Sequence, residues 1–198
     1  MSGEPGGGEL GGAELGALVE VTERSVVLAV TKGHVWVPRP EDHPPALCER
    51  GAAFVTLRED GRLRGCIGTL VAVDSLVVTV ADRARAAALD DPRFPPVSRR
   101  ELADLDVSVS VLSPMRALPV AGYEDLLGKV RPGVDGLMIQ AVYHAATFLP
   151  SVWEELPEPA EFLAHLWLKA RLTPGAWPDG MAVFRYTAQH AERGARRG

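Results

Sequence analysis

Residues 63–68, Leu-Arg-Gly-Cys-Ile-Gly, place a guanidinium, a thiol and two glycines in an expected β-strand. Glycine weakens a strand interior, and it occurs there mainly where the backbone bulges or where another group approaches closely. The apolar stretch 54–57 precedes this segment, and Asp60-Gly61 between them supplies the two positive-φ positions of a tight turn. The segment is therefore predicted to be the second strand of a β-hairpin.

The register of this hairpin decides which side chains share a face. A two-residue turn predicts cross-strand pairs of Phe54 with Ile67, Val55 with Cys66, Leu57 with Arg64, and Glu59 with Arg62. Alternation along the strands then places Phe54, Leu63 and Ile67 on the core face. Arg64 and Cys66 are predicted to lie together on the opposite face.

Cys66 is the candidate catalytic residue, because a nearby cation lowers the pKa of a thiol and so raises its thiolate fraction. On this interpretation Arg64 tunes the thiol. The alternative is an inert, half-buried cysteine, since free cysteines are among the most buried residue types and often only pack. The residues alone identify no reaction, so whether the protein is an enzyme stays open.

Length and composition narrow the class of protein. The 198 residues allow one domain or two small lobes, and a net charge of −5 with both signs interspersed does not indicate nucleic-acid binding. No apolar run approaches the ~20 residues that span a bilayer, so no membrane association is expected. Cys48 and Cys66 follow no secretory segment, which predicts free thiols in the cytoplasm. The high usage of Ala, Gly, Arg, Val and Pro suggests a bacterial genome rich in G and C.

No metal site and no cofactor is expected. The histidines stand singly along the chain, and neither a C-x-x-C nor an H-x-x-x-H spacing occurs. The chain also has no P-loop, no dinucleotide-binding fingerprint after a strand, and no G-x-S-x-G elbow.

Periodicity and breaker residues predict the organisation of the chain. Residues 1–12 are expected to be a disordered Gly-rich tail, 13–190 the domain, and 191–198 a disordered basic tail. Helices are predicted at 13–33, 75–91 and 159–170, further strands at 105–112, 136–140, 147–149 and 181–188, and a long Pro-rich loop at 37–50. Because hairpins with inserted helices prevail over strict βαβ alternation, the fold class is α+β, a mostly antiparallel sheet with helices packed on one side.

Asp91-Pro92-Arg93-Phe94 is a second unusual segment, because it sets a charged pair and an aromatic on a proline-locked turn at the end of a helix. Arg93 is predicted to complement the negative helix end. Alternatively, Arg93 and Asp91 rim a pocket.

The hexapeptide 63–68 matches the signature of the AMMECR domain family, called AmmeMemoRadiSam system protein A in bacteria. The similarity continues through 54–57, 91–94 and 149–156, and it covers nearly the whole chain from Ala13 to Ala188. The resemblance implies an α/β chain of two unequal lobes. It also implies an association with a Memo-like protein, similar to the extradiol dioxygenases, and with a radical-SAM protein. It supplies no reaction.

Three hypotheses follow. The preferred one is a non-catalytic component that docks a partner through the Gly-rich strand and the Pro-rich loops. The second is a small cysteine-dependent enzyme or modification partner that uses Cys66 as a thiolate, with Arg93 or Thr69 orienting a substrate. The third is that the hexapeptide only shapes a tight sheet crossing. The candidate binding residues are Arg64, Gly65, Gly68, Thr69, Asp91 and Arg93.

Overall fold

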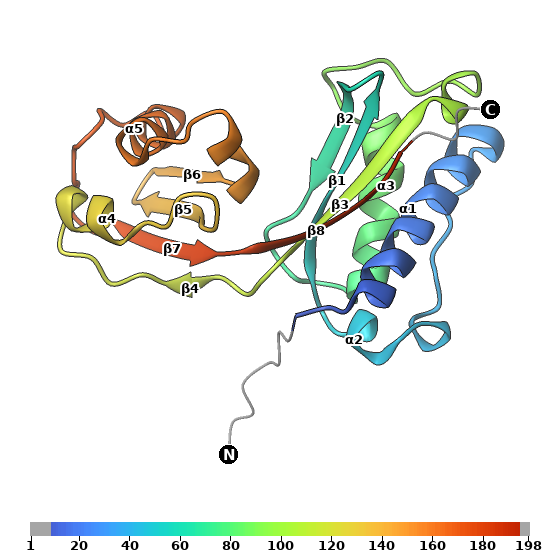
Figure 1. Cartoon of the computed structure of the whole chain (residues 1–198), viewed down its shortest axis with the longest axis horizontal. Helices are drawn as coiled ribbons and strands as arrows, with labels where there is room; N and C mark the ends of the chain where they lie inside the picture. The colour runs from blue at the N-terminus through green and yellow to red at the C-terminus, as the bar shows by residue number, and fades with distance from the viewer. Residues whose placement is uncertain (1–8, 195–198) are drawn as a thin grey trace. The chain divides into compact units, whose positions relative to one another are not determined.

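The computed structural model describes residues 9–194, which divide into two compact units (Figure 1). Unit 1 runs to Leu112 and resumes at Gln189, whereas unit 2 is Ser113–Ala188. The two unequal lobes implied by the resemblance are confirmed. Both lobes contribute to the span 13–190 that was expected to be the AMMECR-like domain.

In unit 1, α1 (Gly12–Lys32) and α3 (Leu76–Leu89) cover one face of a four-stranded sheet (Figure 1). The strand order is β2 (Arg62–Gly68), β1 (Ala52–Glu59), β3 (Leu105–Leu112) and β8 (Ala188–Arg193). The central strand β1 is antiparallel to both β2 and β3. Alternate residues of the strands pack against the two helices in a core that includes Leu18, Val55, Val80, Ala84 and Val109. The α+β class is therefore confirmed.

Local signals explain where several of these elements end. Helix α1 stops at Gly33, whose φ of 60° is the left-handed conformation that glycine adopts readily. Asp60 and Gly61 have φ of 49° and 75°, as the predicted hairpin turn requires. The Pro-rich segment holds only short helical turns, at η1 (Pro40–Asp42) and α2 (Pro45–Cys48). A third turn, η2 (Glu101–Ala103), precedes β3.

Unit 2 is a second four-stranded sheet with its own aromatic core. The strand order is β4 (Arg116–Ala117), β7 (Ala182–Tyr186), β5 (Gly136–Ala141) and β6 (His144–Phe148). The remaining elements are α4 (Tyr123–Lys129), η3 (Pro150–Glu154) and α5 (Pro159–Lys169). Trp153 of η3 stacks on Phe162 of α5, with ring centroids 3.7 Å apart, and both side chains are buried.

The end of the chain differs from the sequence prediction. The expected single strand 181–188 is two strands, and residues 191–193 belong to β8 instead of a disordered tail. Arg193 is held by Glu23 of α1 at 2.6 Å, and the side chain of Gln189 bonds both backbone polar groups of Leu10. Leu10 in turn packs against the core of unit 1, so the N-terminal segment is ordered before residue 13. The other expected tail residues, 1–8 and 195–198, lie outside the described residues.

Among the described residues, no helix is long and apolar enough to cross a membrane.

Candidate functional site

A β-bulge shifts the register of the hairpin that carries the hexapeptide. Glu59 faces Arg62 as predicted, but the register shifts between Leu57 and Arg58. Arg64 is the extra residue of β2, and beyond it the pairs become Leu57 with Gly65, Thr56 with Cys66, Val55 with Ile67, and Phe54 with Gly68. The three predicted pairs beyond the turn are therefore wrong by one position, since a one-to-one count cannot anticipate a residue that pairs with nothing.

The bulge also decides which face each residue occupies. Gly65 is buried, and Ile67 packs against the core of unit 1. Cys66 lies between them in the alternation, on the face away from the helices, as predicted. The predicted core location is wrong for two residues. Leu63 is exposed, and Phe54 shares the face of Cys66 because its partner in the register is Gly68.

Both glycines of the motif are required because a neighbouring group lies where a side chain would have to be. A Cβ on Gly65 would lie 2.1 Å from the carbonyl oxygen of Ala87, so β2 runs directly against the backbone of helix α3. A Cβ on Gly68 would lie 2.2 Å from the ring of Phe54, which covers the glycine from the neighbouring strand. These two candidate binding residues therefore set packing distances within unit 1.

Arg64 is directed at a carboxylate that the sequence analysis did not select. Its Nε donates to Oε1 of Glu101 at 2.5 Å, and its side chain is only 12% exposed. The other oxygen of Glu101 accepts from the backbone N–H of Ser98 at 2.7 Å, which is the hydrogen bond of an S-x-x-E capping box. The guanidinium of Arg64, followed by the Ser98 hydrogen bonds, lowers the pKa of Glu101 to about 2. The S-x-x-E spacing of Ser98 and Glu101 is a signal for the capping hydrogen bond, but nothing in the sequence indicates the ion pair of Glu101 with Arg64.

Asp91 and Arg93 together clamp the backbone of Cys66. Asp91 Oδ2 accepts from the Cys66 N–H at 2.8 Å, and Arg93 Nη2 donates to the Cys66 carbonyl at 3.1 Å. The two side chains also bind each other side-on, through Nε to Oδ1 at 2.9 Å and Nη2 to Oδ2 at 2.7 Å. Because β2 is an edge strand of the sheet, this clamp satisfies backbone groups that another strand would otherwise pair with.

The clamp combines a buried anion with a half-exposed cation. The side chain of Asp91 is 2% exposed and that of Arg93 is 52% exposed. Hydrogen bonds from Arg93, together with those from the backbone of Cys66 and Arg93, hold the pKa of Asp91 well below its usual range despite burial. Asp91 in turn raises the pKa of Arg93, to which Cys66 also contributes. The cation that accompanies Cys66 is thus Arg93, whereas Arg64 is bound to Glu101.

Cys66 is half-buried, and its thiol interacts with the side chains of Arg93 and Thr56. The hydroxyl of Thr56, its cross-strand neighbour, donates to the sulfur at 3.4 Å. Thr69 lies elsewhere: its backbone N–H donates to Ala53, and its hydroxyl bonds both backbone groups of Val71. The structure therefore brings Cys66, Asp91 and Arg93 together, adds Thr56, and separates Thr69 from them. Among the described residues, no cluster of three or more His, Cys, Asp or Glu is arranged to hold a metal ion.

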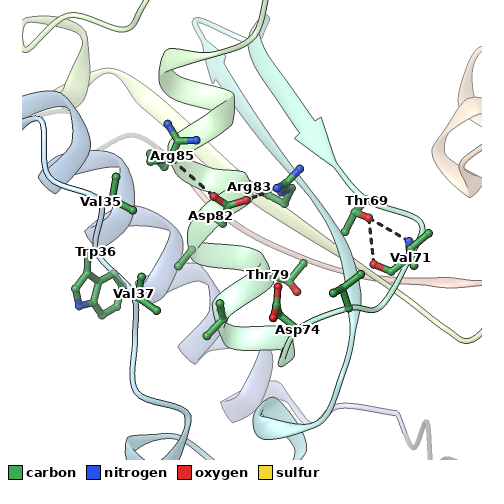
Figure 2. A pocket seen from close by; sticks show the side chains of 13 residues that line it. Val35, Trp36, Val37, Thr69, Val71, Asp74, Thr79, Asp82, Arg83 and Arg85 are labelled. Atoms are coloured by element: carbon green, nitrogen blue, oxygen red, sulfur yellow. Dashed lines mark hydrogen bonds and ion pairs between the residues drawn. The ribbon is translucent and has the colours of Figure 1, made fainter.

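Thr69 instead lines a cavity of about 500 Å³ in unit 1 (Figure 2). Its walls are the extended segment 35–37 on one side and the loop 69–74 on the other, with the outer face of α3 between them (Figure 2). Cys66 does not line this cavity. The hexapeptide and the cavity are therefore separate features of the same unit.

Comparison with known proteins agrees with the signature in the hairpin. The AMMECR1 family model matches residues 19–191. The chain belongs to the AMMECR1 family. Within this AMMECR1 family, the chain is 41% identical to a protein of Methanothermobacter thermautotrophicus over 76% of this chain and 79% of that protein. It is 38% identical to a protein of Thermococcus gammatolerans over 91% of each chain.

A solved structure of similar fold comes from Pyrococcus horikoshii. That crystal structure, of an uncharacterised protein, has a TM-score of 0.84 and 34% sequence identity, and covers 94% of each chain. These AMMECR1-family relatives are archaeal, so the bacterial origin suggested by composition stays a prediction.

The ion pair of Glu101 predicts a specific loss of stability in acid. The folded-state pKa, about 2, lies below the ordinary value of 4.5, so the stabilisation is complete above about pH 4.5 and is lost as pH falls toward 2. We expect Glu101→Gln to lower the free energy of unfolding at pH 7 by roughly 1 to 2 kcal/mol, and the gap from wild type to narrow below pH 4. Urea unfolding at pH 7, 4 and 3 measures both. The exposed Glu155→Gln is the control; a gap for Glu101→Gln that is constant with pH contradicts the prediction.

Proposed function

We propose that this AMMECR1-family protein is a non-catalytic docking component that works in the cytoplasm with a Memo-like protein and a radical-SAM protein. The observation that carries the proposal is that the charged side chains of the hexapeptide and of the segment 91–94 are bound to other groups of the protein. Arg64 is bound to Glu101, and Asp91 and Arg93 are bound to each other and to the backbone of Cys66. These groups fix the edge of a sheet. The side chains that interact with the thiol are the guanidinium of Arg93 and the hydroxyl of Thr56, and neither is a general base at neutral pH.

Binding to purified partners tests the proposal. We expect the full chain to bind a Memo-like or radical-SAM protein encoded by the same genome, and Cys66→Ser to change the dissociation constant less than twofold. The reason is that the sulfur makes only weak side-chain contacts, with Thr56 and Arg93. Isothermal titration calorimetry gives the constants, and a thermal melt confirms that the variant is folded. Absence of binding to both partners refutes the proposal, and so does a tenfold loss in a well-folded Cys66→Ser variant.

A cysteine-dependent reaction is the second candidate, and the observation that favours it is the guanidinium of Arg93 beside Cys66. On this hypothesis the thiolate of Cys66 attacks an electrophile, and the alkylation rate should already be high near pH 7. We would follow iodoacetamide alkylation against pH in a Cys48→Ser background. A rate that rises only above about pH 8, as for an ordinary cysteine, counts against this candidate.

A further inference from the structure

Four valines stand around the cavity of unit 1 with most of their surface in solvent. Val35 and Val37 on one wall are 59% and 63% exposed, and Val71 and Val73 on the other are 65% and 64% exposed. Exposed apolar side chains that are scattered singly need no explanation, but those gathered around one concave site mark a binding surface. The apolar rim therefore distinguishes this cavity from an incidental hollow.

The wall formed by residues 35–37 is backbone outside any helix or strand, and it runs straight past α3 (Figure 2). The segment is extended, with Val35 and Val37 exposed and Trp36 turned inward, where it packs on the core beneath Arg24. Among the described residues, the backbone groups of 35–37 make no hydrogen bond. Such a row of free donors and acceptors is what an extended peptide needs in order to pair as an added strand.

Among the described charged side chains that line the cavity, one acidic group has no basic partner. Asp82 is bound to Arg83, and Arg85 is bound to Asp90 at 2.7 Å. Asp74, on the loop wall, has no ion pair within the part of the chain that the structure describes. A ligand that complements this surface is thus aliphatic along its length and carries a positive charge at the end near Asp74.

We propose that the cavity between 35–37 and 69–74 binds an extended aliphatic peptide segment of a partner protein, flanked by lysine or arginine. The peptide backbone pairs with residues 35–37, its alternate side chains enter the valine-lined cavity over α3, and its basic residue meets Asp74. This proposal rests on the proposed docking function and assigns the docking surface, away from Cys66 and its clamp.

A designed peptide tests the recognition chemistry directly. The probe is a blocked hexapeptide in which valine alternates with threonine between two terminal lysines, titrated into the full-length chain while amide chemical shifts are recorded. We expect saturable shifts centred on the cavity-lining residues, with at least tenfold weaker binding after N-methylation of alternate peptide bonds, because the methyl groups remove the backbone donors. Equal binding of the methylated peptide, or shifts elsewhere, overturns the proposal.

Variants on the two walls test the residues involved. Val37→Ser with Val73→Ser should weaken peptide binding about tenfold, since two apolar contacts are lost. Val142→Ser is the control, a valine of unit 2 that is 73% exposed, and should leave binding unchanged. Asp74→Lys should weaken the lysine-flanked peptide about three- to fivefold and strengthen a glutamate-flanked one. Stronger binding of the glutamate-flanked peptide to the wild-type chain contradicts the charge assignment.

The same variants separate this proposal from the proposed function. If the purified partner binds and the Val37→Ser/Val73→Ser variant weakens it as it weakens the peptide, both proposals are supported. If the partner binds the variant as well as wild type, the docking surface is wrong and the docking function stands. If the peptide binds and neither partner does, the docking function is wrong and the peptide site stands. Sedimentation that reveals a dimer lost in the variant makes a second copy of the chain the occupant and overturns the proposal.

Discussion

Gly65→Ala is expected to destabilise unit 1 by about 3 kcal/mol or more, because the new methyl group has no space. Its Cβ would lie 2.1 Å from the carbonyl oxygen of Ala87 and 3.1 Å from the carbonyl carbon. Both atoms belong to the backbone of α3, so no side-chain rotation relieves the clash. Strand β2 and helix α3 must move apart, which opens the core on either side of them. Urea unfolding at pH 7, followed by far-UV circular dichroism, measures the loss.

Two further glycine variants make this result specific. Gly16 lies on α1 with nothing within 4 Å of an added Cβ, so Gly16→Ala should stabilise the helix by roughly 0.5 to 1 kcal/mol. Gly68→Ala should fall between the two, since its clash is with the ring of Phe54, which is a side chain. An unfolding midpoint for Gly65→Ala within error of wild type would mean that α3 does not approach β2 as closely as described.

The sequence was sufficient for elements whose signals are local. The alternation of Leu105 to Leu112 predicted β3 with its bounds, Gly33 predicted the end of α1, and Asp60-Gly61 predicted the hairpin turn. Each depends on periodicity or on a φ preference that neighbouring residues determine. The antiparallel class followed from the order of these elements.

The bulge, the clamp and the last strand could not be predicted, because contacts distant in sequence determine them. The two glycines of 63–68 allow a bulge, but they do not indicate that Arg64 is the residue left out of the register, since the ion pair that holds Arg64 comes from Glu101. The role of Asp91 depends on the path of α3, which brings it back to the edge strand. The C-terminal residues 191–193 lack an apolar alternation, and they form β8 through their place beside β3 and the ion pair of Arg193 with Glu23.

These contacts give the hexapeptide and Asp91-Pro92-Arg93-Phe94 a common physical basis. The first segment supplies an edge strand whose glycines allow a helix and an aromatic ring to come close, and the second supplies the side chains that close that edge. Both segments are therefore required for the fold of unit 1. The exposed valines at the cavity have no such use within the described residues, and for that reason the docking surface is assigned to them.

Arg93→Met is expected to lower the free energy of unfolding by about 3 kcal/mol, more than Asp91→Asn, although Arg93 is the exposed partner. Removing the guanidinium leaves a carboxylate that is 2% exposed with only backbone N–H donors, and a buried charge without a counterion is costly. Asp91→Asn removes the charge but leaves a polar group beside Cys66, and the remaining guanidinium, 52% exposed, is hydrated. We expect about 2 kcal/mol for this variant.

The pH dependence and a double-mutant cycle complete this test. The pKa of Asp91 is lowered from 3.8 in the folded state, so the stabilisation is complete above about pH 4 and declines as pH falls. The gap between wild type and Asp91→Asn should therefore narrow between pH 4 and pH 2.5 in urea unfolding. Asp91→Asn with Arg93→Met should cost less than the sum of the single variants, because the second change removes the partner that the first left unpaired. Additive losses, or a gap that widens in acid, would show that the two side chains do not act as one clamp on Cys66.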